Sequence, residues 1–563
     1  MPLLALVALI ACASSGKDGD TPADPTDSGD TQDTDTQDTD TDTQDTDTED
    51  TDSGDSGEEE GLPPVVVSCE APLPYSDVTG GVGARDLAGD FTLPTERGDW
   101  TLSERWTGCD SYLFLVYQPT GSYGTKLWGS DVDDLLDRTP EDVMIFFLSD
   151  RADPEDAAAD VAEMKANVEE ALAGRDADEA ERWRARFHYV PTPVGDLDGW
   201  IPEVVADWGA DHFAIDMSQR LRPLGMLYNL SHATPRLRYV ANEALYYQFE
   251  AERQRALDAE GATVIPVWSE EPMSDTGWAG VSSYADVVLP DADEMAGYDT
   301  MSLDLSMDCA GHLDSACPAW DYLVSLYLCD ADDPDTCDTE IGRWVTTYAR
   351  EGRWVTDVSP ILALLKDGGT RRLRFYTTQA YLVSMDIRLS NQGSGLSAEG
   401  AEYLFSGGSF NETYNDAYSP LTFTVPADAK KVELVATISG HGWGADTENC
   451  AEFCDHTHHF VVNGEEWVKE HPEAGTSSGC ESEVPLGTVP NQFGTWYYGR
   501  GGWCPGREVA PWVVDITDAV TIGGENTVEY YGLLRDEVYV PDYTDPGGFW
   551  ANIDMTSYVV FWR

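Results

Sequence analysis

Two carboxylates in this sequence stand directly beside paired cysteines, an arrangement that can hold a carboxylate in a fixed direction. Asp321 follows Cys317 and a tryptophan, and it precedes an apolar segment typical of a strand. Glu452 lies midway between Cys450 and Cys454, a spacing that a disulfide can close into a tight turn. Partial burial raises the pKa of a carboxyl group and suits it to general acid–base catalysis, for example in amide hydrolysis. Asp321 and Glu452 are therefore candidate catalytic residues, and the alternative is that they are turn or surface carboxylates.

Groups suited to sugar binding lie close to these carboxylates in the sequence. Arg500 offers a charged fork that can pair with a carboxylate. Trp320, Trp443 and Trp503 offer flat apolar faces of the kind that stack on sugar rings. His441, which lies between two glycines, offers a donor to a sugar hydroxyl. The alternatives are a surface ion pair, core tryptophans and a turn histidine; we predict substrate-binding roles for all five residues.

The histidines after Cys454 form a separate pattern. His456 and His458 make a His-x-His pair, which can bind copper or zinc. Because neighbouring residues of a strand point to opposite faces, His458 and His459 are not expected to share one ion. We therefore predict no metal ligands and no cofactor.

The other cysteines indicate export. If Cys12 is set aside, ten cysteines remain, an even number that occurs in pairs close in the sequence. Such pairs are typical of disulfides formed in an oxidising compartment, whereas a zinc site would favour Cys-x-x-Cys spacing, which is absent from the sequence. The predicted disulfide cysteines are Cys69, Cys109, Cys309, Cys317, Cys329, Cys337, Cys450, Cys454, Cys480 and Cys504.

The N-terminal segment resembles the leader of a bacterial lipoprotein. An apolar run ends in Leu9-Ile10-Ala11-Cys12, which predicts a signal peptide over residues 1–11 and a lipid on Cys12. Residues 12–64 are rich in Asp and Thr and nearly devoid of apolar side chains, so they are predicted to be a disordered linker. We expect an outer membrane lipoprotein on the extracellular or periplasmic face. The alternative is an ordinary cleaved signal with a chance cysteine.

The charge of the chain excludes one class of partner. Of the formal net charge of −71, about −18 falls in residues 17–60, so the remaining domains are strongly acidic as well. A surface of this sign repels nucleic acid. We therefore predict no nucleic acid as partner, and we expect a membrane contact through the lipid and a monomer.

Residues 65–270 combine helical and strand-like segments. Apolar runs at 112–117 and 143–148 suit buried strands, residues 154–186 are helical in composition, and a helix over 235–260 precedes a strand at 263–268. This alternation predicts an α/β layer.

Three phrases in this part resemble the peroxiredoxin-like branch of the thioredoxin superfamily. They are Gly89-Asp90-Phe91-Thr92-Leu93-Pro94, Phe213-Ala214-Ile215-Asp216 and Arg222-Pro223-Leu224-Gly225. Where that family has its redox cysteine, this chain reads Gln118-Pro119-Thr120-Gly121-Ser122. Without a thiolate the usual disulfide chemistry is not possible, so we predict a redox-inactive thioredoxin-like domain.

The rest of the chain has the period of β-structure. At 301–307 and 431–438 apolar and polar residues alternate, and glycine-rich and Asp/Asn-rich turns separate such segments. We predict two antiparallel β-sandwich domains in tandem, at 271–396 and 397–563.

Three segments of this half resemble peptide-N-glycosidase F, in the same order. They are Cys317-Pro318-Ala319-Trp320-Asp321, then Gly440-His441-Gly442-Trp443-Gly444 with Cys450-Ala451-Glu452-Phe453-Cys454, then Gly494-Thr495-Trp496 with Arg500-Gly501-Gly502-Trp503-Cys504-Pro505-Gly506. The resemblance implies two jelly rolls with a site between them and metal-free hydrolysis of the bond between asparagine and N-acetylglucosamine. It places the catalytic aspartate at Asp321, the substrate-orienting glutamate at Glu452 and its paired arginine at Arg500. It also implies the disulfides Cys309–Cys317, Cys450–Cys454 and Cys480–Cys504.

The sequence departs from that family at two positions. A second glutamate of the catalytic region is replaced in the segment holding Thr378 and Gln379, and Tyr322 replaces an arginine that often follows the catalytic aspartate. The expected fold is thus multidomain: a disordered acidic linker, an α/β thioredoxin-like domain and two all-β jelly-roll sandwiches. The function that the resemblance implies is a membrane-anchored amidase that releases N-linked glycans, with an N-glycoprotein or glycan as substrate. The alternatives are a non-catalytic glycan- or protein-binding lipoprotein on the same fold, and a relative of copper-dependent monooxygenases.

Overall fold

The computed structural model describes residues 61–120, 122–208, 212–229 and 234–563. The predicted signal peptide, the lipidated Cys12 and all of the linker except residues 61–64 lie outside the described residues. Among the helices in the described ranges, none is both long enough and apolar enough to cross a membrane.

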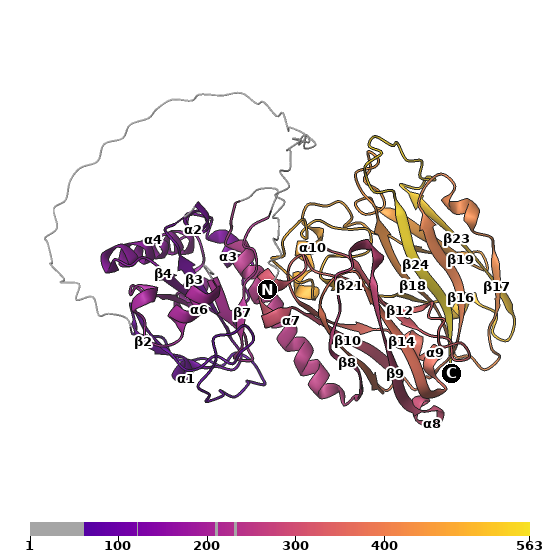
Figure 1. Cartoon of the computed structure of the whole chain (residues 1–563), viewed down its shortest axis with the longest axis horizontal. Coiled ribbons are helices and arrows are strands. Elements are labelled where there is room, and N and C mark those ends of the chain that lie inside the picture. The colour runs from indigo at the N-terminus through magenta and orange to yellow at the C-terminus, as the bar shows by residue number, and fades with distance from the viewer. Residues whose placement is uncertain (1–60, 121, 209–211, 230–233) are drawn as a thin grey trace, which may run out of the picture. The chain divides into compact units, whose positions relative to one another are not determined.

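An α/β unit surrounds a five-stranded sheet with the strand order β5-β4-β3-β6-β7 (Figure 1). The strands are β3 (Ser111–Tyr117), β4 (Val143–Ser149), β5 (Phe187–Tyr189), β6 (His212–Ile215) and β7 (Leu221–Pro223). β3, β4 and β5 are parallel, whereas β6 and β7 run antiparallel to their neighbours. The two predicted strands are confirmed as β3 and β4; the thioredoxin-like assignment stays a prediction.

The sheet is buried on both faces, which explains why β3 and β4 are continuous apolar runs. Leu113 and Leu115 pack with Val161 and Met164 of a helix on one face, whereas Phe114 packs on the other face. The predicted helical stretch 154–186 is two helices, because the side chain of Asp176 caps a new helix. The remaining elements are β1 (Thr92–Thr95), β2 (Gly98–Thr101), α1 (Leu102–Arg105), α2 (Ser122–Trp128), α3 (Asp133–Leu136), α4 (Pro154–Leu172), α5 (Ala177–Arg186) and α6 (Ile201–Trp208).

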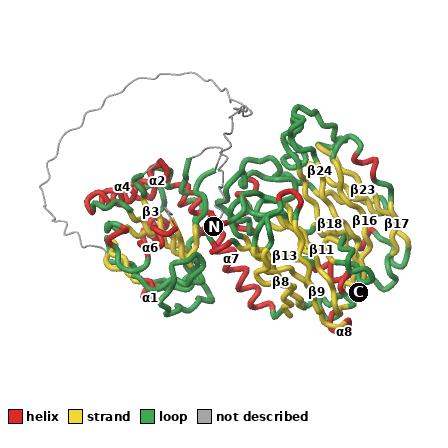
Figure 2. The backbone as a smooth tube through the Cα atoms, in the orientation of Figure 1, coloured by secondary structure: helices red, strands yellow, loops and turns green. Residues whose placement is uncertain are grey.

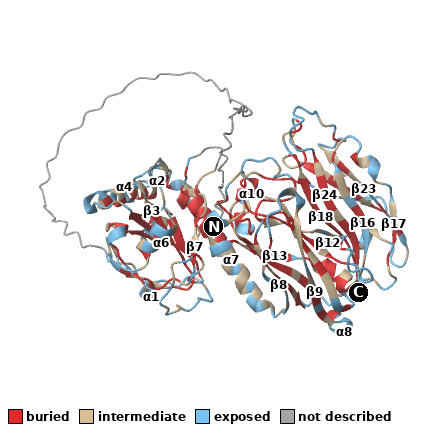
Figure 3. Cartoon of the chain, viewed as in Figure 1, coloured by how far each residue is buried: buried red, intermediate tan, exposed pale blue. Residues whose placement is uncertain are grey.

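The predicted long helix is α7 (Arg238–Glu260), which joins the α/β unit to the β-rich half. Its first half is buried and its last turns are more exposed (Figure 3). Glu243 of α7 forms a fully buried ion pair with Arg350, and Arg238 donates two hydrogen bonds of 2.6 and 3.0 Å to Glu481. These pairs tie the helix to both sequence regions of the β-rich half.

Two antiparallel sheets form the first sandwich, with the orders β13-β10-β15-β8 and β21-β12-β11-β14-β9. Figure 2 shows that strands dominate this part of the chain. Met301, Leu303, Leu305 and Met307 are buried at 0–1 % exposure, which confirms the alternation read from 301–307. The elements are β8 (Thr263–Pro272), β9 (Val281–Asp291), α8 (Ala292–Met295), β10 (Thr300–Asp308), β11 (Leu323–Leu328), β12 (Thr339–Val345), β13 (Gly352–Asp357), α9 (Leu362–Leu365), β14 (Gly368–Thr377), β15 (Leu382–Ser390) and β21 (Arg507–Glu508).

A second sandwich has the sheet orders β16-β24-β18-β22 and β17-β23-β19-β20. In β18 the residues on both faces of the strand are buried. Val435 packs with the core of the first sandwich, and Leu434 packs in the core of the second sandwich. The sheet that contains β18 is therefore covered on both faces. The elements are β16 (Ala398–Ser409), β17 (Leu421–Thr424), β18 (Lys431–His441), β19 (His456–Val462), β20 (Glu465–Lys469), α10 (Gly479–Ser482), β22 (Trp512–Asp515), β23 (Glu525–Leu534) and β24 (Asn552–Trp562).

Two strands correct the expected domain boundaries. β8 pairs with β15, so the first sandwich begins at Thr263 and not at residue 271. β21 comes from the C-terminal region but pairs with β12 of the first sandwich through Trp344 and Val345. The segment 397–563 is therefore not a self-contained domain, since it lends a strand to its neighbour.

All ten cysteines predicted to form disulfides are paired. Three bridges join cysteines four or eight residues apart, and the other two span 24 and 40 residues. The three pairings implied by the family resemblance are present, together with two more. The bridges are Cys69–Cys109, Cys309–Cys317, Cys329–Cys337, Cys450–Cys454 and Cys480–Cys504.

Candidate functional site

Asp321 lies in a short segment held from two sides by side-chain hydrogen bonds. The carbonyl of Trp320 accepts hydrogen bonds from Thr346 Oγ1 at 2.7 Å and Gln379 Nε2 at 2.5 Å. The backbone N–H of Tyr322 donates to Thr346 Oγ1 at 2.8 Å. Because the residues before and after Asp321 are both fixed, the direction of its carboxylate is fixed as well.

Glu452 is held by the disulfide that closes its loop and by the backbone. Its N–H donates to the carbonyl of Gly442 at 3.2 Å, and its carbonyl accepts from the N–H of Gly501 at 2.7 Å. The second bond joins the loop to the segment that carries Arg500. The frozen loop predicted from the cysteine spacing is thus present.

Arg500 brings the two carboxylates together. Its side chain is completely buried, its Nε lies 3.0 Å from Oε1 of Glu452, and its Nη2 lies 3.8 Å from Oδ2 of Asp321. Nη1 donates to the carbonyls of Thr495 and Tyr498 at 3.2 and 2.7 Å. The three residues that the family resemblance selects therefore lie together in the structure. The full burial of Arg500 places it behind the carboxylates, where it positions Glu452 and is not exposed to a sugar.

Burial raises the pKa of both carboxyl groups. The pKa of Asp321 is raised to about 6, mainly by burial, while Arg500 and a hydrogen bond with Tyr348 act in the opposite direction. The pKa of Glu452 is raised to about 7 by burial and by the charge of Asp321, against the attraction of Arg500. The side chains of both carboxylates are 12 % exposed, so they reach solvent at a narrow edge. Near neutral pH such a pair can accept and return a proton.

The three predicted tryptophans differ in exposure. Trp320 and Trp443 are 59 and 52 % exposed, so their faces are open to a ligand as predicted. Trp503 is only 6 % exposed, and its indole N–H donates to the carbonyl of Gly440 at 2.7 Å. The guanidinium of Arg500 lies 5.3 Å from its ring centroid. The expectation that Trp503 stacks on a sugar is therefore wrong; it supports Arg500 from within the core.

His441 lies at the end of β18, stacked on Trp503 with ring centroids 5.3 Å apart. Its Nε2 is 2.8 Å from the hydroxyl of Ser439 and 3.8 Å from Asp554. Burial lowers its pKa to about 4, so the ring is neutral at physiological pH. The sugar-binding role of His441 stays a prediction.

Sequence reasoning missed three residues that organise the site. Tyr348 hydrogen-bonds to Asp321, Thr346 links Trp320 to Tyr322, and Gln379 brackets Trp320 from both its N–H and its carbonyl. In the sequence Gln379 indicates only that a carboxylate is absent. These contacts join segments between strands that are distant in sequence, so no local spacing predicts them.

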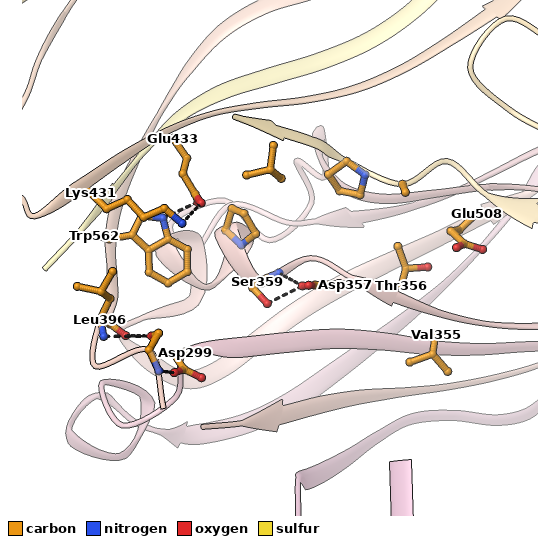
Figure 4. Close-up of a pocket in the computed structure, with 15 residues that line it drawn as sticks. Asp299, Val355, Thr356, Asp357, Ser359, Leu396, Lys431, Glu433, Glu508 and Trp562 are labelled. Atoms are coloured by element: carbon orange, nitrogen blue, oxygen red, sulfur yellow. Dashed lines mark hydrogen bonds and ion pairs between the residues drawn. The ribbon is translucent and has the colours of Figure 1, made fainter. Parts of the chain in front are cut away.

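The pocket in Figure 4 lies away from these residues. It has a volume of about 500 Å³, and its lining includes neither Asp321 nor Glu452. Its charged groups are partly paired with each other, since Lys431 pairs with Glu433 and Trp562 Nε1 donates to Glu433 at 2.6 Å. A second pocket of about 290 Å³ reaches Arg500 and Trp503. The candidate catalytic site is therefore the pair Asp321 and Glu452, and not the pocket of about 500 Å³.

Residues 409–560 match the family described as peptide-N-glycosidase F, C terminal. A curated relative, the peptide-N(4)-(N-acetyl-beta-D-glucosaminyl)asparagine amidase F of Elizabethkingia miricola, is 23 % identical over 329 residues, which are 54 % of this chain and 86 % of the relative. Solved structures of similar sequence are as remote. A recombinant peptide:N-glycanase F is 20 % identical, with a TM-score of 0.41 and coverage of 53 % of this chain and 95 % of that one.

The glycosylasparaginase PNGase F of Flavobacterium meningosepticum is 19 % identical with the same TM-score, and the alignment covers 54 % of this chain and 96 % of that one. The family match covers β17 to β23 and most of β24, and it includes Glu452 and Arg500. Residues 409–560 of this chain are therefore similar to the family described as peptide-N-glycosidase F, C terminal.

Proposed function

We propose that this protein is an exported, membrane-anchored amidase that hydrolyses the bond between asparagine and the first N-acetylglucosamine of an N-linked glycan. The observation that carries the proposal is the convergence of Asp321 and Glu452 on the buried guanidinium of Arg500. The name of the curated relative, an amidase of this specificity, supports the same reaction.

In the proposed reaction Asp321 accepts a proton from a water molecule. At the same time the oxygen of that water bonds to the side-chain amide carbon of asparagine. The carbon–nitrogen bond then breaks, the proton passes to the departing nitrogen, and the products are a glycosylamine and an aspartate residue. A base with a pKa near 6 is mostly ionised at neutral pH yet can still return its proton. Glu452 holds the first sugar, and Trp320 and Trp443 offer exposed faces to the glycan.

A second candidate function is non-catalytic binding of a glycan or protein. The observation that favours it is Gln379, an amide in the segment where the related enzymes are expected to carry a further carboxylate. The side-chain oxygen and nitrogen of Gln379 form hydrogen bonds with Trp320 and Thr346, and these bonds hold the Asp321 segment in place. Gln379 thus preserves the shape of the site while supplying no charge.

The two candidates separate in one assay. The purified full-length protein is incubated with a denatured N-glycoprotein, and we expect free glycan together with conversion of the glycosylated asparagine to aspartate in the peptide mass spectrum. The non-catalytic alternative predicts retention of glycopeptide on the immobilised protein with no mass conversion. Binding without conversion would contradict the amidase proposal.

We propose further that a lipid on Cys12 anchors the protein to the outer membrane. The supporting feature is the sequence Leu9-Ile10-Ala11-Cys12 after an apolar run. We expect Cys12→Ser to move the protein from the membrane fraction to the soluble fraction and to abolish incorporation of labelled fatty acid, whereas Ser14→Ala should change neither. Equal membrane partition of Cys12→Ser and wild type would contradict a lipid anchor.

A further inference from the structure

Three imidazoles meet inside the second sandwich, apart from the carboxylate site. His456 and His458 come from the same face of β19, and His471 follows β20. Their exposures are 0, 0 and 5 %, and one nitrogen from each ring lies within 4.8 Å of the others. By contrast His459 points the other way, toward Glu466 at 3.1 Å. The alternation of β19 thus excludes His459 but brings its two neighbours together with a histidine distant in sequence.

The contacts of the rings leave ligand nitrogens facing one another. His458 Nδ1 lies 2.7 Å from the hydroxyl of Tyr530, which orients the ring with Nε2 toward His456 Nδ1 at 2.8 Å. His456 Nε2 is buried and has no hydrogen-bond partner among the described residues. Metal-binding histidines commonly have one ring nitrogen on a neighbouring oxygen, as His458 has on Tyr530. A metal ion between the rings would replace the hydrogen bond that now joins His456 Nδ1 to His458 Nε2.

His471 supplies the second observation that points to a ligand. Its Nε2 is buried and has no hydrogen-bond partner among the described residues, while its ring lies 4.7 Å from that of His456. An orphaned buried nitrogen is rare, because it loses its bond to water and gains nothing in exchange. A metal ion between the rings would satisfy this nitrogen.

The three candidate ligands are all imidazole nitrogens, and this decides the class of metal. Imidazole nitrogens prefer borderline transition metals such as zinc and copper over calcium or magnesium.

The backbone segments that pack against the three histidines also carry or adjoin Glu452 and Arg500 of the carboxylate site. A Cβ on Gly440 or Gly501 would lie 2.3 or 2.6 Å from His456 Nε2, and one on Gly502 would lie 2.7 Å from the His471 ring. Glycine is needed at all three positions for the chain to pass so close to the rings. The cluster therefore lies directly against the ends of the Glu452 loop and of the Arg500 segment.

We propose that His456, His458 and His471 bind one transition-metal ion of the zinc–copper class, which holds the Glu452 loop and the Arg500 segment against β19. Two nitrogens on one tetrahedral ion are about 3.3 Å apart for bonds of about 2.05 Å. The His456–His458 pair, at 2.8 Å, needs to open by about half an ångström, and His471 closes the remaining gap by turning its ring. The ion stabilises the fold and takes no part in amide hydrolysis.

Metal content and thermal stability test the site without reference to activity. The purified full-length protein is equilibrated with Zn²⁺ in one arm and with Cu⁺ under reducing conditions in the other, desalted, and analysed for metal per chain. We expect one equivalent in at least one arm and a Tm higher by a few degrees than that of the chelator-treated protein. Co²⁺ in the same protein should give the visible absorption of a tetrahedral nitrogen site.

Two variants separate this site from adventitious binding. His471→Leu should retain less than one tenth of an equivalent and lose the Tm increase, whereas His459→Gln, on the opposite face of β19, should behave as wild type. If His471→Leu does not fold, the wild-type cobalt spectrum and Tm increase still decide. Retention of neither metal, or equal retention by wild type and a folded His471→Leu protein, would overturn the proposal.

Discussion

Replacing Asp321 with asparagine should lower the rate of glycan release by about 10³-fold while the glycopeptide still binds. Asparagine keeps the size of the side chain and can occupy the place beside Arg500, but it cannot take a proton from water. The pKa of the aspartate, about 6, makes it the more fully ionised base of the pair at neutral pH, since Glu452 at about 7 is still about half protonated there. The measurement is a single-turnover rate on a defined glycopeptide, together with its dissociation constant.

The matched control is Asp330→Asn, which removes an exposed carboxylate from the loop closed by Cys329 and Cys337. It should leave the rate unchanged. In the wild type the rate should rise as the pH passes about 6, because the base has to be ionised, and Asp330→Asn should keep that profile. A loss of less than tenfold in Asp321→Asn would assign the base to another group.

Local sequence patterns predicted the strands well where one face or both faces of a strand are buried. The alternation at 301–307 and the continuous run at 112–117 each correspond to a strand of the expected kind. Strand β21 had no such signal, because a two-residue strand has no period and forms only where the first sandwich presents an open edge at β12. Domain boundaries were therefore less predictable than the strands themselves.

The site residues likewise differ in how well local sequence predicts them. The family phrases placed Asp321, Glu452 and Arg500 correctly in one neighbourhood, because each is fixed by a cysteine loop or by backbone contacts nearby. Residue type alone failed for Trp503, since a tryptophan that supports a guanidinium and one that stacks on a sugar look the same in sequence. His471 was missed for a similar reason: it joins the histidine pair only through the packing of the second sandwich.

The largest effect on stability should come from Arg500→Leu, and it should depend on pH. The guanidinium is fully buried and lowers the pKa of both carboxyl groups, so its removal raises both values further above 6 and 7. A carboxyl group whose pKa is higher in the folded state binds more protons there than in the unfolded chain. Stability is then lost as the pH rises from the unfolded pKa toward the folded one.

At pH 8 the variant must either bury two unpaired carboxylates or keep these groups protonated at a pH well above their ordinary pKa. Either state lowers the free energy of unfolding by about 3–5 kcal/mol and Tm by about 5 °C or more. At pH 5 both groups are largely protonated in the variant, and the remaining cost is about 1–2 kcal/mol from the lost hydrogen bonds to Thr495 and Tyr498. The measurement is Tm by calorimetry at the two pH values. Arg535→Leu, which breaks an ion pair with Glu448 at a side chain that is 72 % exposed, should change Tm little at either pH.

A second substitution identifies the cause of the loss. In the Arg500→Leu background, Glu452→Gln replaces the nearer carboxylate with a neutral amide and should restore part of the stability at pH 8 but little at pH 5. The guanidinium also packs on Phe453 and Trp503, at 4.5 and 5.3 Å from the ring centroids. If Arg500 acted mainly through this packing, the loss of stability would be equal at both pH values and Glu452→Gln would recover none of it. A pH-dependent loss that Glu452→Gln relieves therefore requires that the charge of Arg500, held behind two carboxylates, sets the protonation of the site.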